Sequence, residues 1–477
     1  MSIPYRPSYI NNILAKFLIR ERKIKMSNLK VGFSRHDITP RLGHYVSGYY
    51  EVRFAKEVLD SLEMHAIAFS NGDKKSIILN YDLIDLPNKL SNSIREAVSE
   101  YCGVPFDAVF ANCTHTHTGP QLSEIETQPD EVNEQIRDYN KNLVLISRDC
   151  AKFAFDNLKD AEVYVAEGEA KDISFVRRYR MKDGGVQTNP GVGNPEIDHV
   201  LDQASEAVKV IEIKRCGGDD VYLVNFGVHA DVIGGDVISA DFPRFVRESI
   251  EGALPGVKCV FLNGAEGDVN HIKPFPTEAD RVGLNYDSFD NVPRGYEHSK
   301  HMGRVIAGAA LTVCTKAVKV DADKIGFGTK LISIPSNMEN DRLEEAKYID
   351  DMVKAGKQDE LPYKKMELTT AKAEAARILR LKDGPEAFNI KLTCLRFGDV
   401  AFVGLPGEPF TGLGRQIIAA SPFDTTVVCC LTNGDGYYYP TTAAYDEGGY
   451  EVKSSPLKKG VAEIITGAIV DILNEIK

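Results

Sequence analysis

The sequence predicts an α+β (mixed α/β) fold in which β-sheets are flanked by helices. Short runs of β-branched and aromatic residues, typical of buried strands, recur along most of the chain. Amphipathic patterns with the helical period lie between them. The two kinds of element follow each other in irregular order, which argues against a simple doubly wound sheet. We find no internal repeat and no low-complexity tract.

The elements can be placed along the chain from these patterns. Strands are predicted at 76–81, 107–112, 221–226, 257–262, 392–396, 400–405 and 426–431. Helices are predicted near 90–101, 130–158, 241–252, 297–317 and 456–475. The segment 338–384 holds two highly charged helical stretches with weak apolar stripes, so we expect a helical surface insertion there. One large domain would span 29–477, preceded by an N-terminal extension, 1–28.

The predicted strand 107–112 is followed by the most informative motif of the chain, Thr114-His115-Thr116-His117-Thr118-Gly119-Pro120. Residues two apart in a strand point to the same side, so both imidazoles would leave the strand end together. Two neutral imidazoles placed in this way provide half of a metal site, or one ligand beside an acid/base group. On its own, the motif favours the simpler interpretation of two surface histidines in a threonine-rich turn.

Four further places have the same order of a strand, polar residues and a turn. His229 follows the strand 221–226, Glu266 and Asp268 follow the strand 257–262, and Glu408 stands between Gly407 and Pro409. The fourth is a tyrosine-rich stretch at 437–450. Each alone fits an ordinary loop or a buried polar residue. Together, two or three imidazoles and a carboxylate at strand ends favour zinc, which takes N and O ligands and leaves a position for water.

Composition restricts the partners and the location. The net charge of −12 gives no electrostatic attraction to nucleic acid or to an anionic bilayer, so we expect neither partner. The apolar stretch 10–19 precedes a basic stretch, the reverse of the order in a signal peptide, and a cytoplasmic location follows as the default. Translation could start at Met1 or at Met26. The sequence does not predict an oligomeric state.

At this point the sequence resembles the neutral/alkaline (non-lysosomal) ceramidase family. The motifs that carry the resemblance are THTHTGP at 114–120, FGVHA at 226–230, GDVN at 267–270, LPGEPF at 405–410 and YPTTAAYDEGGYE at 439–451. The opening stretch 31–40 is also similar to the start of that catalytic domain. The resemblance runs from about residue 29 to the C-terminus and is specific as a set.

The resemblance implies a role for individual residues. The metal ligands would be His115, His229, Glu408 and Tyr439, with Zn²⁺ as the cofactor. The residues implied to contact the substrate or its oxyanion are His117, Arg177 (with Arg178 as the alternative) and Tyr450. One residue fewer separates Tyr439 from Tyr450 than in the family pattern.

Two departures from the family pattern change the expected chemistry. Asn270 stands where the family has a serine, and a carboxamide is no nucleophile under mild conditions, so we expect water activated by the metal to attack instead. Asn270 would orient that water or the substrate carbonyl. The chain also stops at Lys477, which leaves no room for the family's C-terminal immunoglobulin-like domain. With no signal peptide recognised, this favours a soluble N-acyl substrate over ceramide.

The leading hypothesis is therefore a zinc-dependent amidohydrolase that acts on a linear amide, with an ester as the second choice. The alternatives are a ceramidase proper, a metal-binding homologue without hydrolytic activity, and a sugar-modifying isomerase or lyase with the same metal cup. Four acids are candidates for orienting the ligand imidazoles, although each is equally compatible with a loop acid: Asp82, Asp231, Asp241 and Asp268. A small N-acyl compound is the expected partner, and we expect no stable membrane association.

Overall fold

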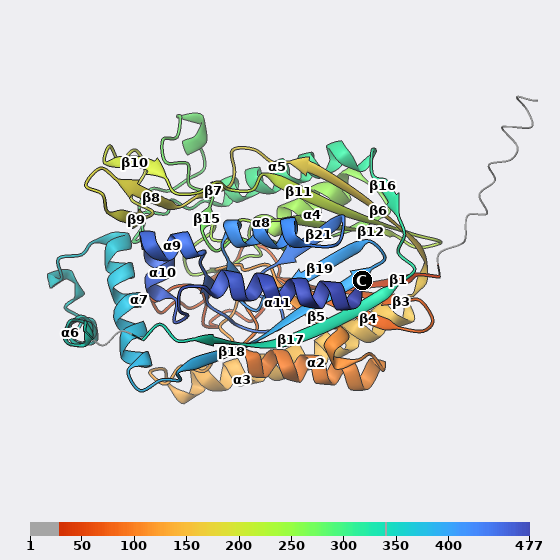
Figure 1. Cartoon of the computed structure of the whole chain (residues 1–477), viewed down its shortest axis with the longest axis horizontal. Coiled ribbons are helices and arrows are strands. Elements are labelled where there is room, and N and C mark those ends of the chain that lie inside the picture. The colour runs from red at the N-terminus through yellow and green to blue at the C-terminus, as the bar shows by residue number, and fades with distance from the viewer. Residues whose placement is uncertain (1–27, 339–340) are drawn as a thin grey trace, which may run out of the picture.

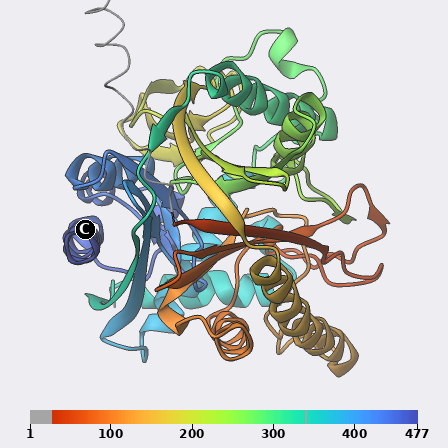
Figure 2. The same ribbon diagram turned by 90° about the vertical axis from the view of Figure 1, so that its right-hand side faces the viewer.

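The computed structural model describes residues 28–338 and 341–477, so nearly all of the predicted extension 1–28 lies outside the described residues. Across the described residues the chain forms four layers, which are two sheets packed face to face and a layer of helices on the outside of each sheet (Figures 1 and 2). The predicted α+β architecture of sheets flanked by helices is confirmed.

The larger sheet has nine strands and is mostly antiparallel. Its order is β14-β12-β11-β6-β1-β3-β4-β5, with β16 paired to β6, and the pairs β12/β14 and β4/β5 are parallel. The strands are β1 Lys30–Asp37, β3 Glu63–Ser70, β4 Lys75–Tyr81, β5 Val109–Cys113, β6 Lys159–Glu169, β11 Ala207–Arg215, β12 Asp220–Phe226, β14 Val257–Asn263 and β16 Val318–Val320. The terminal strands β5 and β14 contact each other, so the sheet curls until its two ends meet.

The smaller sheet has four strands in the order β17-β18-β19-β21. These are β17 Ile325–Pro335, β18 Ala387–Phe397, β19 Val400–Gly404 and β21 Thr425–Cys429. Its inner face packs on the larger sheet through stacked aromatic rings, with the Phe69 and Phe397 centroids 3.7 Å apart. Short two- or three-stranded pairings complete the β-structure around the site, formed by β2 Glu57–Val58, β7 Phe175–Val176, β8 Arg178–Met181, β9 Val186–Thr188, β10 Ile197–Val200, β13 Val237–Ile238, β15 Val269–Asn270, β20 Glu408–Pro409 and β22 Tyr438–Tyr439.

Alternating side chains of each strand supply two different cores. In β3, Ile67 and Phe69 face the smaller sheet, whereas Ala66 and Ala68 face the outer helices. This is the period-two pattern of a strand buried on both faces. Helices α2 Asn88–Cys102 and α3 Asp130–Asp156 cover one half of the outer face, and α4 Phe242–Ala253 and α5 Tyr296–Cys314 cover the other half. Helices α8 Thr411–Ala420 and α11 Val461–Ile476 cover the smaller sheet.

The segment 338–384 contains helices α6 Leu343–Lys354 and α7 Lys365–Leu381, whose apolar faces pack against each other. Helix α7 also packs on α10 Tyr450–Ser454, which follows α9 Thr442–Glu447. Because Met366 and Thr369 of α7 line the pocket over the candidate site, this segment is more than a surface layer and forms one wall of the pocket.

Every strand and helix predicted from the sequence has a counterpart in the structure, with its ends shifted by a few residues. Several long strands were not predicted, including β6 and β17, which carry charged residues or glycines between their apolar positions. No helix of the described residues is long and apolar enough to cross a membrane.

Candidate metal centre

The histidine motif lies just beyond the end of β5. The main chain of Thr114 and His115 continues to pair with Tyr81 and Leu83 beyond the strand, and His115 then takes a positive φ of 69°. A left-handed residue turns the chain sharply, so the imidazoles of His115 and His117 do not point in parallel as the strand period predicts. Their rings meet edge to face at a centroid distance of 4.8 Å. The predicted proximity is present, but a turn produces it.

His229 reaches the same point from β12. Gly227 precedes it in a close approach, because a Cβ there would lie 2.5 Å from the carbonyl oxygen of Ala265. Asn263, at the end of β14, donates from Nδ2 to the carbonyls of both Thr114 and Val228, at 3.0 and 3.1 Å. This buried carboxamide joins the chain before His115 to the chain before His229. It explains why ends of strands far apart in the sheet order meet here.

Main-chain carbonyl oxygens determine which ring nitrogen of His115 and of His229 carries the proton. Nδ1 of His115 lies 3.0 Å from the carbonyl oxygen of Ile84, and Nδ1 of His229 lies 3.0 Å from that of Glu266. A carbonyl can only accept, so each Nδ1 carries the proton and each Nε2 presents a lone pair. The two Nε2 atoms are 3.2 Å apart. Two lone pairs at this distance repel each other unless a cation lies between them.

Glu408 completes a triangle with the two imidazoles. Its Oε2 lies 3.5 Å from Nε2 of His115 and 3.4 Å from Nε2 of His229. Ligands held at about 2.0–2.1 Å from a tetrahedral zinc are separated by about 3.4 Å, which matches all three sides. Glu408 Oε2 is buried and has no hydrogen-bond partner among the described residues. The donor atoms therefore fit a divalent cation.

Glu408 is positioned by a short pair of parallel strands. It begins β20, which pairs in parallel with β22, and its main-chain N–H donates to Tyr437. Gly267 packs directly on the Glu408 main chain, since a Cβ there would lie 2.5 Å from the Glu408 carbonyl oxygen. The glycines of the FGVHA and GDVN motifs thus allow the close backbone packing that brings His229 and Glu408 together.

Tyr438, rather than the predicted Tyr439, lines the pocket next to the candidate ligands His115, His229 and Glu408, which we call the metal pocket. The two tyrosines are neighbours in β22, so their side chains point to opposite faces. Tyr439 is fully buried in the core beneath α8 and α11, with its ring against Gly407. The Tyr438 hydroxyl lies 3.2 Å from Nη2 of Arg177, and it is near enough to Glu408 to lower the pKa of that carboxyl group. The prediction for Tyr439 is wrong by one residue, and counting to Tyr450 from Tyr438 restores the missing residue of the spacing.

Arg177 forms the wall opposite the histidines. Its Nε donates to Glu451 at 2.6 Å and its Nη2 to the Gly267 carbonyl at 2.9 Å, and both Arg177 and Glu451 are buried. Arg178 points away, to Glu447 and the carbonyls at the end of α9. Of the two arginines considered from the sequence, only Arg177 lines the pocket.

The remaining predicted substrate-contacting residues also line this pocket. His117 places Nε2 3.2 Å from Nε2 of His115, close enough to join the ligand set, and its Nδ1 has no hydrogen-bond partner within the described chain. Asn270 donates to Asn189 at 2.9 Å and accepts from the N–H of Ile272 at 3.0 Å. The Tyr450 hydroxyl lies 3.5 Å from that of Tyr50.

Only one of the four candidate orienting acids faces an imidazole. Asp231 lies 3.9 Å from Nδ1 of His117 and is held by Arg294, whose Nη2 is 2.6 Å from it. The other three act on the main chain or on an arginine. Asp82 forms a two-pronged ion pair with Arg247. Asp241 accepts from the main-chain N–H of Phe242, at the start of α4, and from those of Val232 and Ile233. Asp268 accepts from the N–H of Thr411 at the start of α8. The prediction that these three orient imidazoles is wrong, because helix starts and a buried arginine use their oxygens.

Glu266 is the functional carboxylate that the sequence reasoning left without a role. Its Oε2 lies 2.6 Å from Nδ1 of His229 but makes no hydrogen bond to it, since that N–H donates to the main-chain carbonyl of Glu266 itself. A tetrad of His115, His229, Glu266 and Glu408 brings its candidate donor atoms within 4.8 Å of one another. The sequence Gly-Ala-Glu-Gly in the turn after β14 could have identified Glu266 as a candidate, since it places one acid between small residues at a strand end.

Burial controls the charge of the site. It lowers the pKa of His115, His117 and His229 to about 3, so all three imidazoles are neutral at physiological pH. Burial and the nearby Glu266 raise the pKa of Glu408 well above its ordinary value. Burial alone would lower the pKa of Arg177, but Tyr438 and Glu451 raise it well above the usual value. Neutral nitrogens beside two crowded carboxyl groups suit a cation.

The pocket over these groups is narrow and polar. Its cavity volume is about 70 Å³, and Tyr49, Tyr50, Tyr438 and Tyr450 surround it together with charged and amide side chains. Met366 of α7 and Phe289 supply the larger apolar surfaces. The cavity can take a small polar group.

No family model and no curated protein sequence matches this chain. Solved structures do match it. The chain resembles a ceramidase complexed with C2, at 15% identity and a TM-score of 0.67, over 94% of this chain and 75% of that one. It also resembles the neutral ceramidase from Pseudomonas aeruginosa, at 16% identity and a TM-score of 0.66, with the same coverage of both chains. The described chain therefore has the neutral ceramidase fold.

Proposed function

We propose that this protein is a zinc-dependent hydrolase that cleaves the N-acyl bond of a small, polar, soluble amide. The observation that carries the proposal is the triangle of His115 Nε2, His229 Nε2 and Glu408 Oε2 facing the Arg177–Tyr438 pair. Two nitrogens and one oxygen are a ligand set that zinc favours, and Tyr438 would be the fourth ligand or would hydrogen-bond to Glu408. The likeness in fold to ceramidases, which share this layered architecture, supports the same class of reaction.

Zinc bound at this site would polarise the amide carbonyl and lower the pKa of a water molecule. The protein's own residues then have separate tasks. We assign Arg177 and the hydroxyls of Tyr438 and Tyr450, which line the pocket, to stabilising the charge that develops on the carbonyl oxygen, and losing one such donor typically costs about 3 kcal/mol of transition-state stabilisation. His117, whose Nδ1 has no hydrogen-bond partner among the described residues, would contact the scissile amide or its oxyanion.

Asn270 replaces a nucleophilic hydroxyl with a fixed carboxamide. Its oxygen is used by the N–H of Ile272 and one amide hydrogen by Asn189, which leaves the second amide hydrogen free to orient water or the substrate. We therefore propose direct attack by water and no acyl-enzyme at this position.

The size and polarity of the pocket support a soluble substrate. A cavity of about 70 Å³ lined by tyrosines, Arg177, Asn189, Asn270 and Asp231 accepts an acetyl-sized group and offers it hydrogen bonds. A long alkyl chain would have to displace these side chains and leave buried polar groups without partners, which is costly.

A side-by-side assay tests the substrate class. Purified protein loaded with zinc is given ceramide in detergent and a panel of short N-acyl amides, and kcat/KM is measured for each. We expect at least one short amide to exceed ceramide tenfold. Ceramide exceeding every short amide tenfold would overturn the substrate class, and no turnover of any amide or ester by the metal-loaded protein would overturn the hydrolase.

A further inference from the structure

Glu266 is the one acid of the described residues whose two carboxylate oxygens are both buried and without a hydrogen-bond partner. Its side chain is fully buried, and the only basic group described within ion-pair distance is the neutral imidazole of His229. Burial raises the pKa of Glu266, and the thiol of Cys430, a weak donor, is near enough to oppose that rise. A buried carboxylate is costly without a stronger partner, so Glu266 needs one that the described side chains do not supply.

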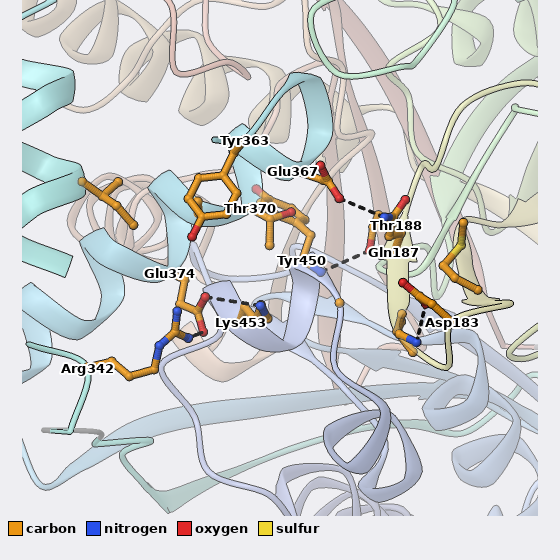
Figure 3. A pocket seen from close by; sticks show the side chains of 16 residues that line it. Asp183, Gln187, Thr188, Arg342, Tyr363, Glu367, Thr370, Glu374, Tyr450 and Lys453 are labelled. Carbon is orange, nitrogen blue, oxygen red and sulfur yellow. Dashed lines mark hydrogen bonds and ion pairs between the residues drawn. The ribbon is translucent and has the colours of Figure 1, made fainter. Parts of the chain in front are cut away.

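Other buried acids of the described chain have such partners. Glu374 lies 2.6 Å from Arg342 and 3.4 Å from Lys453, and both ion pairs can be followed in Figure 3. The buried acids that precede α4 and α8 accept from main-chain N–H groups. The chain therefore compensates its buried carboxylates as a rule, and Glu266 is the exception.

The oxygens of Glu266 lie at the candidate metal site. Donor atoms of His115, His229, Glu266 and Glu408 all lie within 4.8 Å of one another, and Oε2 of Glu408 is also buried without a hydrogen-bond partner. Nδ1 of His229 leaves the Glu266 carboxylate free, because it donates to the main-chain carbonyl of the same residue at 3.0 Å. Gly267, the next residue, packs tightly on the main chain of Glu408, which fixes the turn that carries Glu266. The carboxylates without partners are thus gathered at one point.

Two sets of donors could hold one ion, and the two sets share His115 and His229. One set adds His117, and the other adds Glu266 and Glu408. The set of three imidazoles is uncharged, since burial lowers the pKa of each to about 3. The other set offers two carboxylates, whose charges a divalent cation compensates. In a site closed to water this charge balance favours the set with the carboxylates.

We propose that Glu266 is a fourth protein ligand of the metal, beside the triangle of two imidazoles and Glu408. The inference rests on the metal-dependent function proposed above and assigns one more donor to its site. His117 then stays outside the ligand set and is available to the substrate. Of the two roles considered for Tyr438, the hydrogen bond to Glu408 remains. The occupied site has two nitrogen and two carboxylate donors, which are ligands that zinc accepts.

The test measures zinc binding to the metal-free protein, by competition with a chelator, in the wild type and in Glu266→Gln. The replacement keeps the shape of the side chain and removes its charge. Loss of a group that only supports a ligand typically weakens metal binding about 10- to 100-fold, so we expect the Kd to rise by more than about 100-fold for a ligand. The visible absorption of the Co²⁺-loaded protein is the second readout. Its bands should change in Glu266→Gln, because they depend on the number and kind of ligands.

Two variants serve as controls. His117→Gln removes the competing donor and should keep the Co²⁺ bands of the wild type. Glu367→Gln, at an exposed acid of α7 that accepts from Gln187 (Figure 3), should change neither the zinc Kd nor the bands. Unchanged bands in Glu266→Gln would overturn the assignment whatever the Kd. Loss of metal in His117→Gln with full binding in Glu266→Gln would also overturn it and would favour the set of three imidazoles.

A second variant covers the case in which Glu266→Gln does not fold. Glu266→Ala leaves space for a small carboxylate, and added formate should restore zinc binding toward the wild-type Kd. Absence of any restoration would overturn the ligand.

The same measurements separate this inference from the proposed function. Zinc binding that depends on Glu266 as described, without turnover of any amide or ester, supports the ligand and means that the hydrolase alone fails. Turnover of short amides by the zinc-loaded wild type, with a zinc Kd and Co²⁺ bands that Glu266→Gln leaves unchanged, overturns the ligand and leaves the hydrolase standing.

Discussion

The two sides of the metal pocket are built in different ways. On the histidine side, main-chain carbonyls of Ile84 and Glu266 orient the rings, and the buried Asn263 ties the two chain segments together. On the opposite side, the position of Arg177 and Tyr438 depends on side chains, above all on Glu451. The positions of the histidines are therefore determined by the main chain at the ends of the sheet strands. The position of Arg177 depends on one buried ion pair, with Glu451, whose partners are 274 residues apart in the sequence.

This difference predicts which side of the pocket tolerates substitution without loss of the fold. Carbonyl acceptors cannot be removed by substitution, so the imidazoles keep their orientation as long as the sheet folds. An ion pair buried away from water costs several kcal/mol when one partner is lost, because the other charge stays buried without compensation. We expect substitutions on the histidine side to remove the metal without unfolding the protein, and substitutions on the arginine side to weaken the fold and the substrate contacts together.

The largest effect is expected from the double substitution His115→Ala/His229→Ala. Two of the three triangle donors are lost, so metal content should fall from about one ion per chain to background, and turnover with it. Elemental analysis of the purified protein measures the content, and circular dichroism should show a retained fold. His199→Ala, at an exposed histidine of β10, should keep the metal. Full occupancy in the double variant would remove both histidines from the ligand set.

A smaller effect, on stability, is expected from Glu451→Gln. The carboxamide keeps only one of the two acceptor oxygens that Arg177 and Thr188 use and leaves the buried guanidinium without a counter-charge, and we expect a loss of about 3 kcal/mol in the free energy of unfolding. Denaturant titration measures it. The neighbouring Glu447→Gln, at a partly exposed acid whose partner Arg178 also bonds to two carbonyls, should cost less than about 1 kcal/mol. Equal losses in the two variants would show that the two sides do not differ as described.

The smallest effect comes from a matched pair of neighbours, Tyr438→Phe and Tyr439→Phe. Removing the Tyr438 hydroxyl takes away a group beside Glu408 and Arg177, and kcat/KM should fall about 10- to 100-fold. The Tyr439 hydroxyl is buried with no hydrogen-bond partner within the described chain, so its removal should leave kcat/KM within about twofold and should not destabilise the protein. Initial rates and denaturant titration of both variants decide it. A larger loss at Tyr439 would restore that residue to the site.

The class of fold and most residues of the candidate site could be predicted from the sequence alone. Apolar runs with a period of two specify strands whatever their partners are, and the motif residues His115, His117, His229, Glu408, Arg177, Asn270 and Tyr450 all line one pocket or its ligand set. The strand predictions depend on local periodicity, and the roles of these residues depend on the resemblance of their motifs to the ceramidase family; both can be read one segment at a time.

Which of two neighbouring tyrosines faces the candidate metal site, and what each acid contacts, depends on the tertiary structure. Tyr438 and Tyr439 are equivalent as residue types, and the face that β22 presents to the core selects between them. From the sequence, Asp82, Asp241 and Asp268 could each orient an imidazole, but Arg247 and main-chain N–H groups occupy their oxygens. Glu266 lies in the candidate metal site because another strand brings His229 beside it. Strand register and long-range contacts depend on the packing of all the layers at once, which no local pattern contains.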